Sequence, residues 1–381
     1  MVDRPAFTLG VEEEYLLVDK ATRDLVHEPP AALMAAFEAD IGKQVTSEFL
    51  KCQVEVETSV CASVEEAHRE LKHLRRSIAR IAGDYGFAPI AASTHPFAHW
   101  EEQVHTRKDR YDMLARDLAG AARRMLICGM HVHIGIEDPD LRIDLMNQAS
   151  YFLPHLLALS TSSPFWHGED MGLDSYRLSV FDTLPRSGMP DVFESFGQYT
   201  RVVEQLAAIG VIPDGTMIWW DIRPSARFPT LESRITDICT RLEDAVAIAA
   251  LFQSLLAALF RLRQKNQRWR LYPGTLTKEN RWRAQRYGAQ GQLIDFGKGE
   301  LVDFSDLAEE LIDIVREEAA VLGCLPYVEH IREIARRGTS ATAQRKIYRE
   351  ALEEGADRQQ ALEAVVDFLI RETVEGVLTG D

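Results

Sequence analysis

The sequence lacks the features that mark a secreted or disulfide-stabilised protein. It holds five cysteines among 381 residues. Their number is odd, they are widely spread, and no C-x-x-C pair occurs, which indicates reduced thiols rather than a disulfide framework. No apolar stretch of the kind that forms a secretory signal is visible near Met1. These absences favour a cytoplasmic protein.

Long apolar runs and an excess of positive charge are also missing. The most apolar stretch, residues 245–260, is shorter than the about 20 residues that span a bilayer, so we expect a buried core helix there. Lysine and arginine number 43 against 59 aspartate and glutamate, a net charge of −16. This balance argues against nucleic acid or an anionic membrane as the main partner, although an anionic small molecule is compatible with locally gathered cations.

Several common nucleotide and hydrolase motifs are absent. The chain has no G-x-x-x-x-G-K-[ST] and no G-x-G-x-x-G that opens a helix after a strand, so neither a P-loop nor a dinucleotide fold is indicated. It also has no G-x-S-x-G nucleophile motif. If the protein uses a nucleotide, metals and strand residues must hold it.

Strands interleaved with helices dominate the first half of the chain. Alternating and apolar patterns predict strands at "FTLGVEEEYLLVD" (residues 7–19), "LKCQVEVETSV" (50–60), "MLICGMHVHIGIED" (125–138) and, as a pair around Phe228 and Pro229, "MIWWDIRPS" and "PTLESRITDI". Because the strands are scattered without regular βαβ alternation, the sequence favours an α+β fold with an antiparallel sheet. We expect one domain over residues 1–381.

Helices and one long loop are predicted between these strands. A helix is expected over residues 63–83, where Ser63 opens a capping box and Gly83 is placed as a stop. A second helix is expected over residues 141–160. The loop over residues 161–191, rich in glycine, proline and serine, is long enough to be a lid or binding loop, with a mobile surface excursion as the alternative.

The C-terminal part is predicted to be nearly all helix. Helical patterns run from Asp237 onward, with a break expected over residues 272–292. We find no internal repeat and no low-complexity tract in the sequence.

Pairs of ionisable residues recur at positions i and i+2 of the predicted strands. Such positions share one face of a strand, about 7 Å apart. The pairs are Glu12 and Glu14, Glu55 and Glu57 (with Gln53), His131 and His133, Asp221 and Arg223, and Glu232 and Arg234. One such pair is usually a solvated outer face, but five coincident pairs favour a shared site. The opposite face of each strand is then mainly apolar and packs against helices. Glu13 lies on this apolar face.

Carboxylates gathered on one face of a sheet need a counter-charge. Oxygen ligands with few histidines indicate Mg²⁺ or Mn²⁺ rather than zinc, and Glu12 and Glu14 are candidate ligands. Arg223 and Arg234 would supply fixed positive charge for a transferring phosphoryl or carboxylate group. The alternatives are a cross-strand ion pair between Asp221 and Arg223 and a zinc site at the histidine pair, which would need a third ligand.

In these residues the chain resembles the glutamate–cysteine ligase superfamily, and in particular the bacterial YbdK-type carboxylate-amine ligases. The similar stretches follow the family's order over nearly the whole length: "GVEEEYLLVD", "QVEVET", "RY" (residues 110–111), "GMHVHIGI", "TSSPF", "RSGMPD", "WWDIRP", "TLESRITD" and "ENRWRAQRYG". The resemblance implies a cupped antiparallel sheet with helices on its outer face and a helical C-terminal part, as in glutamine synthetase and glutamate–cysteine ligase.

The resemblance also implies an activity. Family members use ATP and Mg²⁺ to turn an amino-acid carboxylate, typically the γ-carboxylate of glutamate, into an acyl phosphate, which an amine then converts to an amide. The YbdK-like branch is regarded as only weakly active with cysteine, so the amine acceptor stays open. The loop over residues 161–191 is a candidate to exclude water from the acyl phosphate. The subunit count also stays open, with a homodimer as one alternative.

By motif position, the resemblance implies roles for individual residues. It assigns the metal site to Glu12, Glu14, Glu55, His131 and Glu232. Arg234 is expected to stabilise the transferring phosphoryl group, and Arg223 and Arg177 to bind phosphate or the amino-acid carboxylate. His133 and Glu57 line the same face.

A second basic group lies in the C-terminal half. Arg281, Arg283 and Arg286 are candidates to reach nucleotide phosphates, and the alternative is a solvated basic turn.

Two other functions remain as alternatives. They are a metal-dependent phosphotransferase or hydrolase that uses the same carboxylates, and a non-catalytic binding protein.

Overall fold

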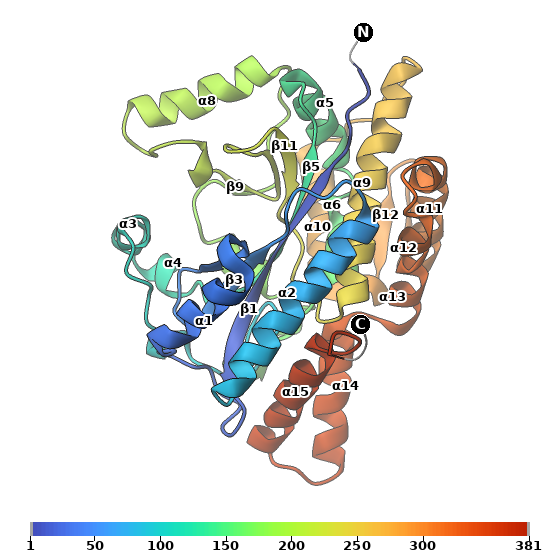
Figure 1. Cartoon of the computed structure of the whole chain (residues 1–381). Coiled ribbons are helices and arrows are strands. Elements are labelled where there is room, and N and C mark those ends of the chain that lie inside the picture. The colour runs from blue at the N-terminus through green and yellow to red at the C-terminus, as the bar shows by residue number, and fades with distance from the viewer. Residues whose placement is uncertain (1–2, 379–381) are drawn as a thin grey trace.

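The computed structural model describes residues 3–378, apart from the side chain of Arg110, and its framework is an antiparallel sheet (Figure 1). The strand order is β10-β11-β5-β1-β3-β2, with β4 also paired to β1. These strands are β1 Leu9–Asp19, β2 Val45–Ser47, β3 Gln53–Glu57, β4 Phe87–Ile90, β5 Met130–Gly135, β10 Ile222–Pro224 and β11 Thr230–Ser233. The predicted α+β class with an antiparallel sheet is confirmed.

Strand β1 holds the sheet together. Its N-terminal half pairs with β5, its middle with β3, and its C-terminal end with β4. From Leu9 to Tyr15 every second side chain is buried and those between are half-buried. This alternation confirms the predicted division into an apolar face and an ionisable face.

Helices cover the apolar face of the sheet. Helix α2 packs on β1 and β4, and α9 packs on β5 and α2 (Figure 1). The helices are α1 Ala31–Ile41, α2 Val64–Asp84, α3 Asp109–Leu118, α4 Gly120–Arg123, α5 Pro139–Ala149, α6 Leu153–Ser160, α7 Arg177–Phe181, α8 Phe196–Ala208, α9 Leu242–Gln264, α10 Gly274–Tyr287, α11 Phe304–Val321, α12 Leu325–Glu329, α13 Ile331–Arg337, α14 Ser340–Glu353 and α15 Arg358–Thr373. Three small sheets pair β6 Phe165–Trp166 with β7 Glu169–Asp170, β8 Ser187–Gly188 with β9 Trp219–Trp220, and β12 Gln292–Asp295 with β13 Glu300–Asp303.

Helix α9 is the one helix of residues 3–378 that is long and apolar enough to cross a bilayer by length and composition. It runs for 23 residues and extends beyond residues 245–260 at both ends, so its length alone does not exclude a membrane span. However, 89% of its most apolar window is buried inside the protein, against α2, α5, α6, α11 and α12. The predicted core helix is confirmed by this burial.

Proline and glycine move two predicted helix boundaries. The helix expected over residues 141–160 is divided into α5 and α6, because Pro154 lacks the N–H of a helix interior and lies in the first turn of α6. Ser63 accepts a hydrogen bond from the N–H of Glu66, as its capping role predicts. Helix α2 nevertheless continues through Gly83, and Gly86, with φ +79°, follows its end.

Two predicted loops are folded. The break expected over residues 272–292 is occupied largely by α10. The long loop predicted over residues 161–191 contains β6, β7, α7 and β8. Its first residues are buried, because the Asp237 carboxylate accepts hydrogen bonds from the Ser163 hydroxyl at 2.7 Å and the Ser175 hydroxyl at 2.8 Å. The start of this segment, residues 161–166, therefore belongs to the packed framework and is not an open lid.

Glu13, the middle of three consecutive glutamates, is fully buried on the apolar face. Its carboxylate accepts hydrogen bonds from Arg75 Nε at 2.9 Å, from Arg75 Nη2 at 2.5 Å and from the Tyr15 hydroxyl. The guanidinium also donates to the carbonyl oxygens of Thr240 and Cys239. Burial opposes the charge of Arg75, but Glu13 outweighs it and raises the pKa of the guanidinium. This pair links β1, α2 and the segment before α9.

Removing one partner of this pair should destabilise the fold strongly. We expect Arg75→Ala to lower the free energy of unfolding by about 3–5 kcal/mol, because it leaves the Glu13 carboxylate buried without a counter-charge. Urea denaturation measures this loss. The control is Arg316→Ala, which removes an exposed ion pair with Asp313 and should cost less than about 1 kcal/mol. Equal losses in the two variants would contradict the role of the pair.

Candidate active site

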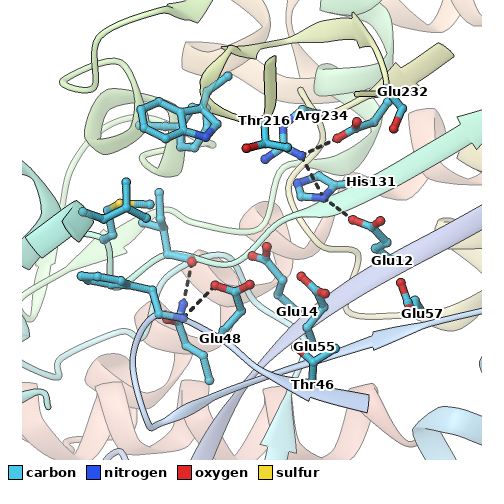
Figure 2. A pocket seen from close by; sticks show the side chains of 18 of the residues that line it. Glu12, Glu14, Thr46, Glu48, Glu55, Glu57, His131, Thr216, Glu232 and Arg234 are labelled. Carbon is cyan, nitrogen blue, oxygen red and sulfur yellow. Dashed lines mark hydrogen bonds and ion pairs between the residues drawn. The ribbon is translucent and has the colours of Figure 1, made fainter. Parts of the chain in front are cut away.

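The ionisable face of the sheet lines a cavity of about 470 Å³ (Figure 2). This volume lies in the range of small-molecule sites. Its lining carboxylates are Glu12, Glu14, Glu48, Glu55, Glu57 and Glu232, and its cations are Lys108, Arg177, Arg223, Arg227 and Arg234. Ionisable side chains of both signs therefore meet in one cavity on this face of the sheet.

Strand register brings most of these groups together. Residues directly opposite each other on neighbouring strands present their side chains on the same face. The opposed pairs are Glu12 with Glu57, Glu14 with Glu55, Glu12 with His131, and Glu232 with His133. Side chains two residues apart on each strand also share this face, so the ionisable face extends across β3, β1, β5 and β11.

Three carboxylates form a cluster at one end of the cavity. Ligand oxygens of Glu14, Glu48 and Glu55 all lie within 4.8 Å of one another, and Figure 2 shows them pointing toward one another. Enclosure raises the pKa of Glu14 to about 8, and the charge of Glu48 adds to this rise. The same two causes raise the pKa of Glu55 well above its usual value. An oxygen-only donor set that is costly to ionise fits a hard divalent cation such as Mg²⁺.

Glu12 is bound by two histidines beside this cluster. It lies 2.8 Å from His131 Nδ1 and 3.1 Å from His133 Nε2. Burial alone would raise the pKa of Glu12, but the hydrogen bond from His131 and the close approach of His133 lower it well below its usual value. Burial, with the charge of Arg234, lowers the pKa of His131 to about 4. His131 is therefore a neutral imidazole that donates to an ionised carboxylate.

Glu232 lies between two arginines at the other end of the cavity. Its carboxylate accepts hydrogen bonds from Arg234 and, at 3.1 Å, from Arg223 Nε. Burial would raise the pKa of Glu232, but the two arginines hold it far below its usual range. The buried Arg234 Nε finds no hydrogen-bond partner among residues 3–378. A buried donor needs a hydrogen-bond acceptor, and an anionic ligand would supply one.

Arg177 is buried beside these arginines. Its guanidinium donates to the carbonyl oxygens of Arg234 and Ile235. A Cβ at Gly129 would lie 2.5 Å from Arg177 Nη2, so only glycine leaves room for the guanidinium there. Arg177 thus lies beside Arg234, and it is also close enough to Glu14 for its charge to oppose the rise in the pKa of that carboxyl.

Nearly all residues predicted for the site line this cavity. They are Glu12, Glu14, Glu55, His131, His133, Arg177, Arg223, Glu232 and Arg234. Arg286 lies on α10 and does not line this cavity. The guanidinium of Arg286 lies 4.9 Å from the Tyr287 ring.

Asp221 departs from its predicted pairing with Arg223. It precedes the first residue of β10 and lies outside the alternation of that strand. Its carboxylate accepts hydrogen bonds from Arg281 Nε at 2.6 Å and Nη2 at 3.1 Å. Arg281 is a candidate for phosphate binding, but its guanidinium already donates hydrogen bonds to Asp221 and to Asp182.

Sequence reasoning missed Glu48 and the apolar wall. Glu48 follows the end of β2 and has no ionisable partner two residues away, so the pattern of pairs could not reveal it. The wall comes from α3, α7, β9 and the segments beside β2 and β5, and consists of Phe49, Leu114, Leu118, Met125, Ile127, Phe181 and Trp219. It gives the charged cavity one apolar side.

Comparison with known sequences finds a family over nearly the whole chain. The sequence matches the glutamate–cysteine ligase family 2 over residues 8–367. A relative from Rhodospirillum rubrum is 60% identical over 374 residues, which cover 97% of this chain and 96% of the relative. A relative from Jannaschia sp. is 53% identical over 366 residues and covers 96% of each chain. Both carry the name "Putative glutamate–cysteine ligase 2".

Solved structures share the fold at low sequence identity. A glutamate–cysteine ligase from Francisella tularensis in complex with AMP is 15% identical, with a TM-score of 0.66 over 99% of this chain and 94% of that chain. A bifunctional glutathione synthetase from Pasteurella multocida is 14% identical, with a TM-score of 0.68 over 95% of this chain and 52% of that chain. These similarities confirm the expected fold.

The raised pKa of Glu14 predicts a pH dependence of stability in metal-free buffer. Because the pKa is about 8 in the folded protein and ordinarily 4.5, the folded state favours the protonated form. The contribution of Glu14 to stability is therefore complete below pH 4.5 and is lost as the pH rises through 8. Glu14→Gln keeps the shape and removes the titration.

Urea denaturation at several pH values, with a chelator present, measures this effect. Between about pH 4.5 and 8 the wild type should lose stability relative to Glu14→Gln. Parallel profiles of the two proteins over this window would show that Glu14 ionises normally.

Proposed function

The chain belongs to the glutamate–cysteine ligase family 2 and is an ATP-dependent ligase that joins a carboxylate to an amine, and we propose that its charged cavity activates an amino-acid carboxylate as an acyl phosphate. The observation that carries the proposal is the division of this cavity. A three-carboxylate cluster lies at one end, and buried arginines with an unpaired donor lie at the other.

The carboxylate end fits Mg²⁺. Glu14, Glu48 and Glu55 would hold the ion, since they offer oxygen ligands whose mutual repulsion a cation relieves. Bound there, Mg²⁺ would neutralise charge on the phosphate oxygens of ATP. Glu12 and His131 adjoin the cluster and are proposed as further ligands or as supports of these ligands.

Glu232 takes a different role in this proposal from the metal ligand that the resemblance implies. Both of its oxygens accept hydrogen bonds from arginines. We therefore assign Glu232 to the positioning of Arg223 and Arg234. Arg223 Nη1 already donates to the carbonyl oxygens of Thr216 and Ile218, so the donor left for a phosphate is Arg234 Nε. A carboxylate that fixes both guanidinium groups makes this end of the site preorganised.

The reaction that fits this arrangement has two steps. An oxygen of the donor carboxylate attacks the γ-phosphorus of ATP, the bond to ADP breaks, and an acyl phosphate forms. The amine nitrogen then attacks the acyl carbon and loses a proton, and phosphate leaves with one oxygen of the former carboxylate. A carboxylate nucleophile needs no general base, so the chain supplies positioning and positive charge from Arg177, Arg223 and Arg234.

The apolar wall is proposed to contact the adenine base or an apolar part of the substrates. The Francisella tularensis ligase of the same fold holds AMP, which supports an adenine nucleotide in this cavity. A metal-dependent phosphotransferase or hydrolase is the second candidate, because the same carboxylates and arginines would serve a water nucleophile.

Isotope transfer distinguishes the two candidates. With an amino-acid donor labelled by ¹⁸O in its carboxylate, a ligase should move one labelled oxygen into phosphate, because that oxygen bridges carbon and phosphorus in the acyl phosphate. Mass spectrometry of the phosphate measures the transfer, and a screen of ADP release over amino-acid and amine pairs selects the substrates. Phosphate labelled only from ¹⁸O-water would support the hydrolase instead.

Loss of the unpaired arginine should impair the chemical step. We expect Arg234→Gln to lower kcat for ADP release by about 10²–10³-fold, as removal of a preorganised donor to a developing charge does. Arg201→Gln, which removes an exposed arginine of α8, is the matched control and should keep the wild-type rate. Wild-type turnover in Arg234→Gln would contradict the role given to this end of the cavity.

A further inference from the structure

A second group of metal-binding side chains lies outside the active-site cavity. Ligand atoms of His99, Glu101 and His167 all lie within 4.8 Å of one another. His99 and Glu101 come from the short 3-10 helix η2 (Trp100–Glu102) and the residue before it, and His167 comes from the turn between β6 and β7. The proposed ligase reaction uses none of the three.

The imidazole of His167 is held in place with one nitrogen unused. Its Nε2 is buried and has no hydrogen-bond partner within residues 3–378. The Trp166 ring stacks on the imidazole, with centroids 5.0 Å apart and an angle of 20° between the planes. A buried ring nitrogen without a partner is costly, and a metal ion is one group that would satisfy it.

The distances suit a shared ion better than direct contacts. His167 Nε2 lies 3.9 Å from Glu101 Oε2, which is too long for a hydrogen bond. Two ligands that each bind one zinc ion at about 2.0–2.2 Å lie up to about 4 Å apart. The ring of His99 lies 4.7 Å from that of His167 at an angle of 62°, so the two rings are not stacked on each other.

The chemistry of this group differs from that of the active site. Two imidazoles and one carboxylate suit zinc, whereas Mg²⁺ prefers oxygen ligands alone.

We propose that His99, Glu101 and His167 bind one divalent transition metal ion, with zinc as the preferred ion. Three protein ligands leave a fourth position open, as in zinc sites that hold water or a small anion. A cavity of about 340 Å³ lies next to Glu101 and His167 and gives that position room. The guanidinium of Arg124 lines the same cavity.

The position of the site defines its effect. The segment of His99 and Glu101 leads into α3, and the turn of His167 leads through β7 to α7. Helices α3 and α7 both contribute to the wall of the active-site cavity. An ion bound between the two segments ties them together, so it stabilises the folded state by mass action.

Equilibrium dialysis of the chelator-treated full chain against Zn²⁺, with excess Mg²⁺ to occupy the acidic cavity, tests the proposal. The wild type should bind one tight zinc ion, and Glu101→Gln and His167→Asn should each weaken this binding at least about 10-fold. Asparagine suits position 167 because it tolerates the positive φ of 51° there. Glu14→Gln is the control, since it alters the acidic cavity and should keep the tight zinc ion.

Thermal unfolding gives a second readout that a merely structural effect would not reproduce. Zinc should raise the midpoint of the wild type and of Glu14→Gln, and should leave that of His167→Asn unchanged, while all three proteins show folded circular dichroism spectra without metal. The proposal is overturned if the wild type binds no zinc, or if the tight ion persists in Glu101→Gln and His167→Asn. Loss of that ion in Glu14→Gln alone would place it in the acidic cavity and would also overturn the proposal, without affecting the proposed ligase function.

Discussion

The two-residue period of strand β1 is the constraint on which the site and the core both depend. It sends Glu12 and Glu14 into the cavity and Glu13 into the apolar layer. A shift of register by one residue would bury two carboxylates among helices and turn Glu13 into the cavity. The Arg75 guanidinium, fully buried on α2, gives one counter-charge at the place where one carboxylate arrives. The same ion pair that completes the core therefore selects the register that forms the site, because no other register leaves both charges matched.

The cavity separates its charges along its length, and this separation is what a phosphoryl-transfer site requires. Carboxylates without arginine partners collect near β2 and β3, where the pKa values of Glu14 and Glu55 are raised. Arginines collect near β11, where Glu232 fixes two of them. If the two sets were mixed, they would neutralise each other as ion pairs and leave neither a cation site nor an anion site. The sheet limits this pairing because Glu14 and Glu55 lie on β1 and β3, whereas Arg223 lies on β10 and Arg234 directly follows β11.

Most of the fold and of the site could be predicted from the sequence, since both follow from local patterns and from the family resemblance. The buried helix α9 and the antiparallel sheet lie as expected. Nine of the ten predicted site residues line one cavity, and their roles stay predictions. All five cysteines of the chain are buried and unpaired in the structure. The two misplaced site predictions share one cause. Each extends the expected strand or turn to a residue that lies outside that element in the structure. Asp221 precedes its strand, and Arg286 lies on a helix where a turn was expected. The single domain, the cytoplasmic location and the homodimer stay predictions.

Local patterns in the chain specify which side chains share a face and what chemistry they offer, because the period of a strand is a local property of two neighbouring residues. Packing between segments, in contrast, makes Arg75 the partner of Glu13, adds Glu48 to the carboxylate cluster, and brings His99 and His167 together. Each of these contacts joins segments far apart along the chain. The packing of whole elements sets such distances, and no spacing within one segment encodes them.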